Sequence, residues 1–213
     1  MFKLKECFLF CQIEKESGLP MLFNDEIRKR FTDKLLAHTK GVEQTARRLA
    51  VVYGADEEKA ALAALLHDYG KTYPEDDLLH IAQTNNIADE FSLQEPVLLH
   101  APVGAWLLEH EQGIEDCDIL NAVRVHTTGA ANMTLFSGII YIADYIEPGR
   151  NFPGVDKIRE LAFRDLHRAL LGAVDLTIRS VLDKQGILHP GSIAFRHWLI
   201  SVLRKREGQE LSL

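Results

Sequence analysis

Apolar residues recur at spacings of three and four along most of this chain, a period typical of amphipathic helices. The alternation with period two that indicates a strand is not found between turn residues anywhere in the sequence. The pattern therefore predicts an all-α protein of about eight to ten short helices. The predicted helices run from Asn24 or Asp25 to about Lys34, over 38–54, 57–69 and 75–84, from about Val103 to Glu111, from Asp116 or Asp118 to His126, and over 133–149, 155–164, 166–184 and 192–204.

Glycine and proline set the expected ends of several segments. Gly70 is expected to end the helix over 57–69, because Gly is favoured just past a helix C-terminus. Pro102 is expected to break or kink its segment, since proline removes a backbone donor from a helix. Residues 85–95 are mostly polar and are expected to form a loop.

Length and composition limit the class of protein. With 213 residues, 46% of them hydrophobic, the chain is long enough for one domain with a substantial core. The net charge of −7 argues against a nucleic-acid polymer as partner, because such proteins usually carry a basic surface. Three cysteines without a disulfide framework are typical of the reduced cytoplasm, and no apolar run approaches the roughly 20 residues that cross a membrane. The expected parts are an N-terminal extension over 1–23, one domain over 24–205 and a polar tail over 206–213.

The most distinctive stretch is LAALLHDYGK (62–71), in which His67 and Asp68 follow a run of apolar residues. A buried carboxylate is costly unless a cation pairs with it. Neutral imidazole and carboxylate both bind divalent metals, so the pair can share one ion. Lys71 follows one turn later, where its charge can meet a phosphate or Asp68 itself. The alternative is a helix end with a dipole-stabilised His67 and a solvated Asp68, and the dipeptide alone does not decide between the two.

Other candidate ligands lie at comparable positions. His38 and His126 are placed where predicted helices begin or end, and His100 lies in the proline-broken segment. Asp144 lies inside the most apolar predicted helix, where an unpaired carboxylate would be costly; it can pair with Arg150 instead of a metal. Each residue has a structural explanation of its own, but a shared site explains the whole set better.

Taken in order, these residues resemble a known family. His38, then His67-Asp68, then Asp144 follow the H…HD…D pattern of HD-domain metal-dependent phosphohydrolases. The resemblance covers about residues 25–200 and is closest to the YqeK family. It is carried by HTKGV (38–42), LLHDYGK (65–71), LLHAPVGAWL (98–107), VRVHTTG (123–129), MTLFSGIIYIADYIEPGR (133–150) and FPGVDKIRELA (152–162). Successive motifs in the right order are far more specific than an isolated HD dipeptide.

The resemblance implies a single HD-domain helical bundle. It also implies symmetrical hydrolysis of diadenosine tetraphosphate, and of related dinucleoside tetraphosphates, to two ADP by a metal-activated water. The implied metal ligands are His38, His67, Asp68 and Asp144, with iron the expected metal and manganese or another divalent ion as alternatives. The expected catalytic residues are Asp68, Lys71, His100 and His126, and the expected substrate contacts are Lys71, His100, His126, Thr127 and Arg150.

The resemblance leaves two possible roles for His100 and His126. They either complete a second metal position with Asp68 as the bridge, or they bind a substrate phosphate. The preferred interpretation is phosphate contact beside one tightly held metal.

Two departures from the family pattern bear on the substrate. The family commonly has a basic or aromatic pair before the first His, where this chain has Leu35-Leu36-Ala37. It often has Arg after HTTG, where this chain has Ala130-Ala131. Both changes remove contacts to phosphate or base. Two alternatives therefore stay open: another HD-type nucleotide phosphohydrolase, which its products would reveal, and a non-catalytic nucleotide-binding module, which would not turn over with iron or manganese. The expected partner is a small nucleotide, and a homodimer is compatible with the sequence.

Overall fold

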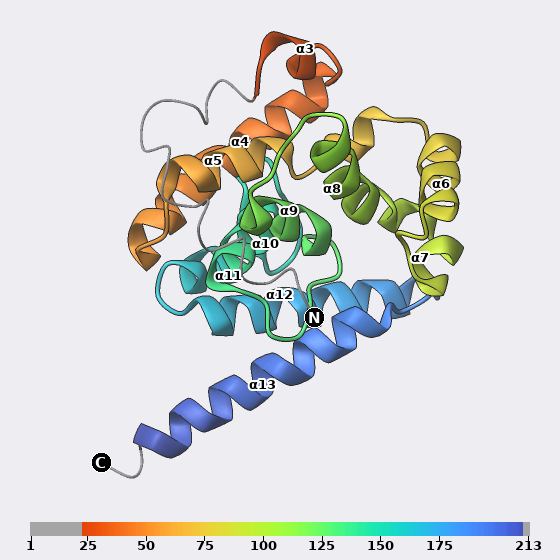
Figure 1. Ribbon diagram of the computed structural model, residues 1–213. Coiled ribbons are helices and arrows are strands. Elements are labelled where there is room, and N and C mark those ends of the chain that lie inside the picture. Colours follow the sequence, from red (N-terminus) through yellow and green to blue (C-terminus); the bar gives the residue numbers. More distant parts are fainter. Residues whose placement is uncertain (1–22, 211–213) are drawn as a thin grey trace, which may run out of the picture.

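The computed structural model describes residues 23–210, and this part of the chain is entirely helical, with no strand. It contains eleven α-helices and two short 3-10 helices (Figure 1), so the all-α prediction is confirmed with one α-helix more than the upper expectation. The expected extension over 1–23 falls almost wholly outside the described residues. The α-helices are α3 (Asp25–Arg28), α4 (Asp33–Tyr53), α5 (Glu57–Leu66), α6 (Glu75–Thr84), α7 (Glu90–Gln94), α8 (His100–His110), α9 (Cys117–Val125), α10 (Leu135–Ile146), α11 (Val155–Ala162), α12 (Leu166–Asp183) and α13 (Pro190–Glu210); the 3-10 helices are η1 (Tyr69–Thr72) and η2 (Pro96–Leu98).

Helix α10 forms the centre of the domain. It packs against α4, α5, α9, α11 and α12, and most of its residues are buried. Its strongly apolar sequence, LFSGIIYIADYI, suits a helix that is covered on nearly every side. Asp144, near the end of this helix, is only partly buried, and the packing of its apolar neighbours fixes its position.

The first predicted helix is divided in two, contrary to the sequence-based prediction. Helix α3 ends at Arg28, and α4 begins at Asp33. Each has its own cap: the Asn24 side chain accepts hydrogen bonds from the first turn of α3, and the Thr32 hydroxyl accepts one from Leu35 N at 3.2 Å. As a consequence His38 lies within α4 rather than at a helix end.

Helix α5 ends three residues earlier than predicted, and Gly70 does not terminate it. The helix stops at Leu66, and Gly70 lies within η1 without a positive φ. Gly70 is required instead for close packing. A Cβ at this position would lie 2.2 Å from the backbone carbonyl oxygen of His100, and one at Gly104 would lie 3.0 Å from Gly70 N. The two glycines allow η1 and α8 to approach closely.

Three other expectations are also corrected. Pro102 does not break its segment, because it lies in the first turn of α8, where backbone N–H groups have no intrahelical partner. The polar stretch 85–95 includes α7, which Asp89 caps. Helix α13 continues to Glu210, past the predicted end near Arg204.

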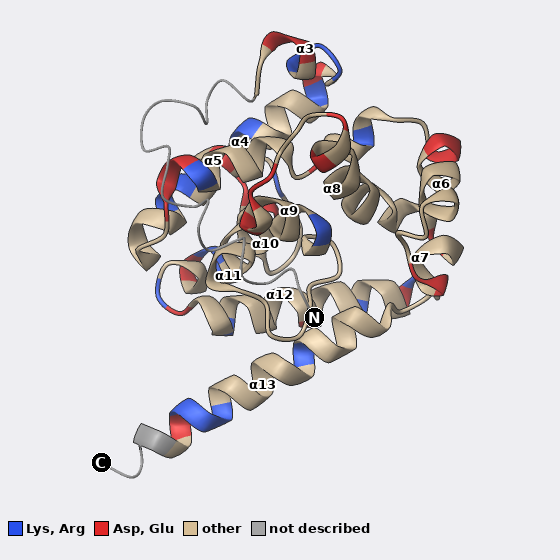
Figure 2. Ribbon diagram, viewed as in Figure 1, with Lys and Arg blue, Asp and Glu red and all other residues tan. Residues whose placement is uncertain are grey.

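Helix α13 projects from the rest of the described chain, and its outer part carries Arg204, Lys205 and Arg206 (Figure 2). Among the described helices, none combines the length and the apolar character needed to cross a membrane.

The close contact at Gly70 predicts a large effect of a single methyl group. Gly70→Ala places a Cβ against rigid backbone, so it should lower the free energy of unfolding by about 1–3 kcal/mol. The matched control is Gly208→Ala, at an exposed position in α13 with nothing within 4 Å, which should leave stability unchanged or raise it by up to about 1 kcal/mol. Urea denaturation of both variants measures the difference. Equal stabilities would contradict the packing role of Gly70.

Candidate metal centre

Helix ends supply most of the candidate ligands. His67 is the C-cap residue of α5, and Asp68 follows it directly. His126 is the C-cap residue of α9, and His100 is the first residue of α8. His38, from within α4, completes the group of histidines. Together with Asp144 of α10, these six predicted residues converge on one point of the fold, although they come from five separate helices or their ends.

The first group of ligand atoms surrounds one side of Asp68. Its Oδ2 lies 3.4 Å from His67 Nε2 and 3.6 Å from His38 Nε2. Asp144 Oδ1 lies 3.1 Å from His38 Nε2 and 3.8 Å from His67 Nε2. Ligand atoms that bind one ion at about 2 Å lie roughly 3–3.5 Å apart, so this spacing suits a shared divalent metal.

The second group surrounds the other oxygen of the same carboxylate. His100 Nε2 and His126 Nε2 each lie 3.4 Å from Asp68 Oδ1. The two nitrogens lie 3.1 Å from one another. Asp68 therefore stands between two sets of nitrogen ligands, one facing each of its oxygens, and its side chain is only 1% exposed.

Backbone carbonyls fix the orientation of the buried imidazoles. In His67, His100 and His126 the Nδ1 atom lies 2.6–2.7 Å from the carbonyl oxygen of the residue three positions earlier. A carbonyl oxygen only accepts, so Nδ1–H donates and the lone pair of the neutral ring is on Nε2, where a metal ligand needs it.

Unpaired polar atoms show that the residues present fit a cation. Among the described residues, three buried side-chain atoms lack a hydrogen-bond partner: His38 Nε2, His67 Nε2 and Asp68 Oδ1. Buried polar atoms are normally satisfied, because an unpaired one costs free energy. All three belong to the ligand groups described above, so a bound cation accounts for them together.

The protonation states also favour a cation. Burial alone would raise the pKa of Asp68, but the charge of His67 and the neighbouring imidazoles of His100 and His126 hold it well below its usual range. The pKa of Asp144 is likewise lowered, against the effect of burial, by the close imidazole of His38 and by the charges of His67 and Arg150.

The pKa values of two buried histidines, His67 and His126, are shifted in opposite directions. Burial lowers the pKa of His126 to about 4, so that ring is neutral at physiological pH. The charge of Asp68 raises the pKa of His67 despite its burial, because in the absence of a metal a proton supplies the positive charge between the acids.

Two cationic side chains connect the buried acids with solvent. Lys71 Nζ lies 2.8 Å from Asp68 Oδ2, and Arg150 Nη2 lies 2.5 Å from Asp144 Oδ1. Both side chains are well exposed, 42% for Lys71 and 38% for Arg150. They are therefore close to the metal centre and also able to meet a ligand.

Glu147 is a site residue that the sequence analysis missed. Its carboxylate is buried, accepts a hydrogen bond from Gly149 N at 2.5 Å and lies 3.2 Å from His38 Nδ1. A carboxylate that accepts from Nδ1–H orients the ring with Nε2 toward the metal position. One feature of the sequence could have pointed to Glu147: it is a second acidic residue, three positions after Asp144, at the end of the most apolar helix.

Arg159 of α11 holds the loop that carries Glu147 and Arg150. Its guanidinium donates hydrogen bonds to the backbone carbonyls of Ile146 and Glu147, both at 2.9 Å, and of Arg150 at 2.6 Å. Anchoring three successive parts of one loop fixes the two side chains relative to α4. Sequence alone gave no sign of this role.

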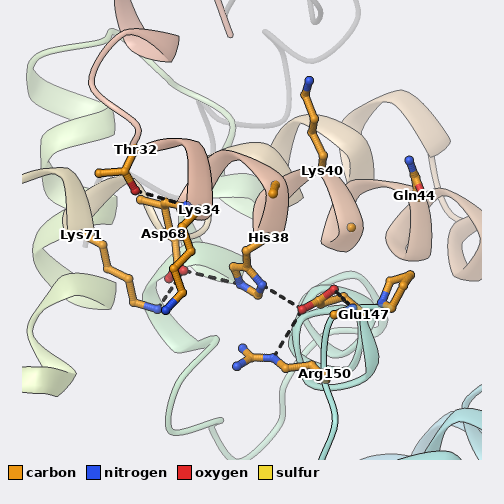
Figure 3. Close-up of a pocket in the computed structure, with 14 residues that line it drawn as sticks. Thr32, Lys34, His38, Lys40, Gln44, Asp68, Lys71, Glu147 and Arg150 are labelled. Atoms are coloured by element: carbon orange, nitrogen blue, oxygen red, sulfur yellow. Dashed lines mark hydrogen bonds and ion pairs between the residues drawn. The ribbon is translucent and has the colours of Figure 1, made fainter.

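A cavity of about 860 Å³ opens beside the metal centre (Figure 3). Helix α4 forms one wall, and residues 147–150 and Lys71 contribute to the others. His38 and Asp68 face it, whereas the buried His100 and His126 do not line it. Thr127, an expected substrate contact just past the end of α9, is not among its lining residues either. The volume lies in the range of small-molecule sites.

Comparisons with known proteins identify the family of the chain. The HD domain family matches residues 35–149. A Bacillus subtilis (strain 168) protein named symmetrical bis(5′-nucleosyl)-tetraphosphatase is 41% identical over 175 residues, which are 82% of this chain and 94% of that protein. A protein of the same name from Halalkalibacterium halodurans is also 41% identical, over 82% of this chain and 93% of its own length.

A solved structure is similar as well. It comes from Clostridium acetobutylicum and is described as a predicted HD superfamily hydrolase involved in NAD metabolism. The TM-score is 0.81 at 42% identity, over 87% of this chain and 98% of that one. The family resemblance inferred from the sequence motifs is thus confirmed: the chain belongs to the HD domain family and, within it, to the family of symmetrical bis(5′-nucleosyl)-tetraphosphatases.

Proposed function

We propose that this chain hydrolyses diadenosine tetraphosphate and related dinucleoside tetraphosphates to two nucleoside diphosphates. The observation that carries the proposal is the position of Asp68, which joins two sets of histidine ligands and faces a cavity with cationic walls. The relatives of this family are named for that activity, and three His/Asp groups of this chain are close enough to hold metal ions.

The proposed metal ligands are His38, His67, Asp68 and Asp144. A mixture of imidazole and carboxylate suits iron and also accepts manganese, so ferrous iron is the metal we propose and manganese the alternative. When bound, the metal lowers the pKa of a coordinated water toward 7, which makes a hydroxide nucleophile available at neutral pH.

We assign His100 and His126, with Asp68, to a second cation position rather than to phosphate contact. Both rings donate through Nδ1, so both Nε2 atoms present lone pairs 3.1 Å apart beside a carboxylate oxygen. A proton or a metal ion must lie between these atoms for the arrangement to be favourable. Neither ring lines the cavity, which also argues against direct contact with substrate.

Two cationic residues of the cavity, Lys71 and Arg150, bind and orient the substrate. Lys71 and Arg150 are placed to stabilise the negative charge on the oxygens of the phosphate under attack. Cleavage at the central bridge releases a diphosphate whose terminal phosphate has a second pKa near 6, like other phosphate monoesters. Such a leaving group needs little protonation, so the site requires no strong general acid.

Metal binding should stabilise the folded protein. At a free metal concentration 100 times the dissociation constant the gain is about 2.7 kcal/mol, which corresponds to a Tm increase of about 5–10 °C for a chain of this size. Thermal unfolding of chelator-treated protein, with and without ferrous or manganous ion, measures it. Asp68→Ala should abolish the increase, and His80→Ala, at an exposed position on α6, should retain it. An increase in Asp68→Ala equal to that of the wild type would refute the ligand assignment.

The variant Lys71→Ala should bind metal normally but turn over more slowly. Because Lys71 is not a ligand, metal content by elemental analysis should match the wild type, whereas kcat should fall about 100-fold through loss of charge stabilisation. His80→Ala again serves as the control. Normal turnover by Lys71→Ala would show that its assigned role is wrong.

The products identify the reaction. Protein reconstituted anaerobically with ferrous iron should convert diadenosine tetraphosphate to ADP alone, as separated by chromatography. AMP plus ATP would mean that the substrate binds in another register. Metal-loaded protein without turnover would favour a different nucleotide substrate or a binding role.

A further inference from the structure

Lys34 is a cation in the cavity with no role in the metal centre. It lies in the first turn of α4, one turn before His38, and its side chain points to the same place as that of Lys71, beside Asp68 (Figure 3). Lys71 is paired with Asp68. Within the described part of the chain, Lys34 has no acidic oxygen within 4.0 Å, so no ion pair there compensates its charge.

The position of Lys34 is unfavourable by local energetics. The N-terminal turn of a helix carries partial positive charge and favours acidic residues, as Asp33 illustrates in the same turn. A second ammonium group from Lys71 lies on the same side of the cavity, and like charges repel. Residues that break local rules in this way are typical of functional sites, and an anion between the two lysines would remove both penalties.

The cations lie on different sides of the metal centre. In Figure 3, the side chains of Lys34 and Lys71 both point into the cavity on one side of His38, while Arg150 approaches from the loop after α10. A polyphosphate bound across this surface would bring its inner phosphates to the proposed ligand groups, near Lys71 and Arg150, and an outer phosphate to Lys34.

We infer that Lys34 and Lys71 form a clamp for the phosphates of one nucleoside diphosphate half of the substrate, and that Lys34 contributes binding rather than catalysis. The inference rests on the proposed function, because it names how that substrate is held. Lys34 also supplies a positive charge next to Leu35 and Ala37, the apolar cavity residues at the place where the sequence appeared to have lost phosphate contacts. An outer phosphate keeps its charge during the reaction, so Lys34 binds ground state and transition state alike, whereas Lys71 also meets the phosphate under attack.

Binding of ADP, the proposed product, tests the clamp apart from turnover. Isothermal titration of ADP into manganese-loaded and into metal-free protein should give a dissociation constant about tenfold higher for Lys34→Ala, the loss expected for one charge-assisted contact. Lys34→Arg should restore most of the affinity. Lys205→Ala, which removes an exposed lysine of α13 far along the projecting helix, is the matched control and should bind ADP like the wild type.

Steady-state kinetics should also show that Lys34 contributes to binding and not to the chemical step. Lys34→Ala should raise KM for diadenosine tetraphosphate about tenfold and leave kcat within about twofold, because uniform binding affects KM alone. Affinity for adenosine, which has no phosphate, should not change. A weaker affinity for adenosine, or a fall in kcat at unchanged KM, would overturn the assignment to phosphate binding.

The clamp and the proposed function fail in distinguishable ways. Symmetrical turnover by the wild type, with ADP affinity and KM of Lys34→Ala unchanged, would refute the clamp and leave the function intact. Absence of turnover in metal-loaded wild type, with ADP affinity still lost in Lys34→Ala, would refute the function and support Lys34 as part of a nucleotide site.

Discussion

The buried carboxylate of Asp68 is the group on which the rest of the site depends. Its two oxygens face separate pairs of imidazole nitrogens, and Lys71 adds a third contact from the solvent side. An isolated charge at such a position would be strongly destabilising, so the residue requires compensation from every side. The same requirement suits the position to a metal, because one or more cations would satisfy the unpaired nitrogen lone pairs and acidic oxygens together.

Three of the four histidines around Asp68 are oriented by the same local hydrogen bond. His67, His100 and His126 each hydrogen-bond through Nδ1 to the carbonyl three residues earlier, which leaves Nε2 directed at Asp68. Two of these rings are helix C-caps, where backbone carbonyls lack intrahelical partners and are free to accept. Gly70 then allows η1 to approach α8 closely enough for His100 to reach the same carboxylate.

The open side of the site is organised by a loop rather than by helix packing. Arg159 anchors residues 146–150 through their carbonyls, and that loop carries Glu147 to His38 and Arg150 to Asp144. The metal centre is thereby joined to a cavity with cations on its walls, which is the surface that a polyphosphate requires. In the proposed function, the buried histidines and aspartates hold the metal, and the partly exposed cations of the cavity hold the substrate.

The sequence by itself determined the helical class, most helix positions, and the set of residues His38, His67, Asp68, His100, His126 and Asp144 that the structure brings together. Helical periodicity and caps report the local environment of each residue, and these local signals were strong. Only the tertiary structure decided that Gly70 serves packing, that Glu147 orients His38 across 109 residues of sequence, and that Lys34 faces Lys71. It also decided against Thr127 as a cavity residue. These facts depend on distances between segments far apart in the chain, and such distances are set by how helices pack, which no single segment encodes.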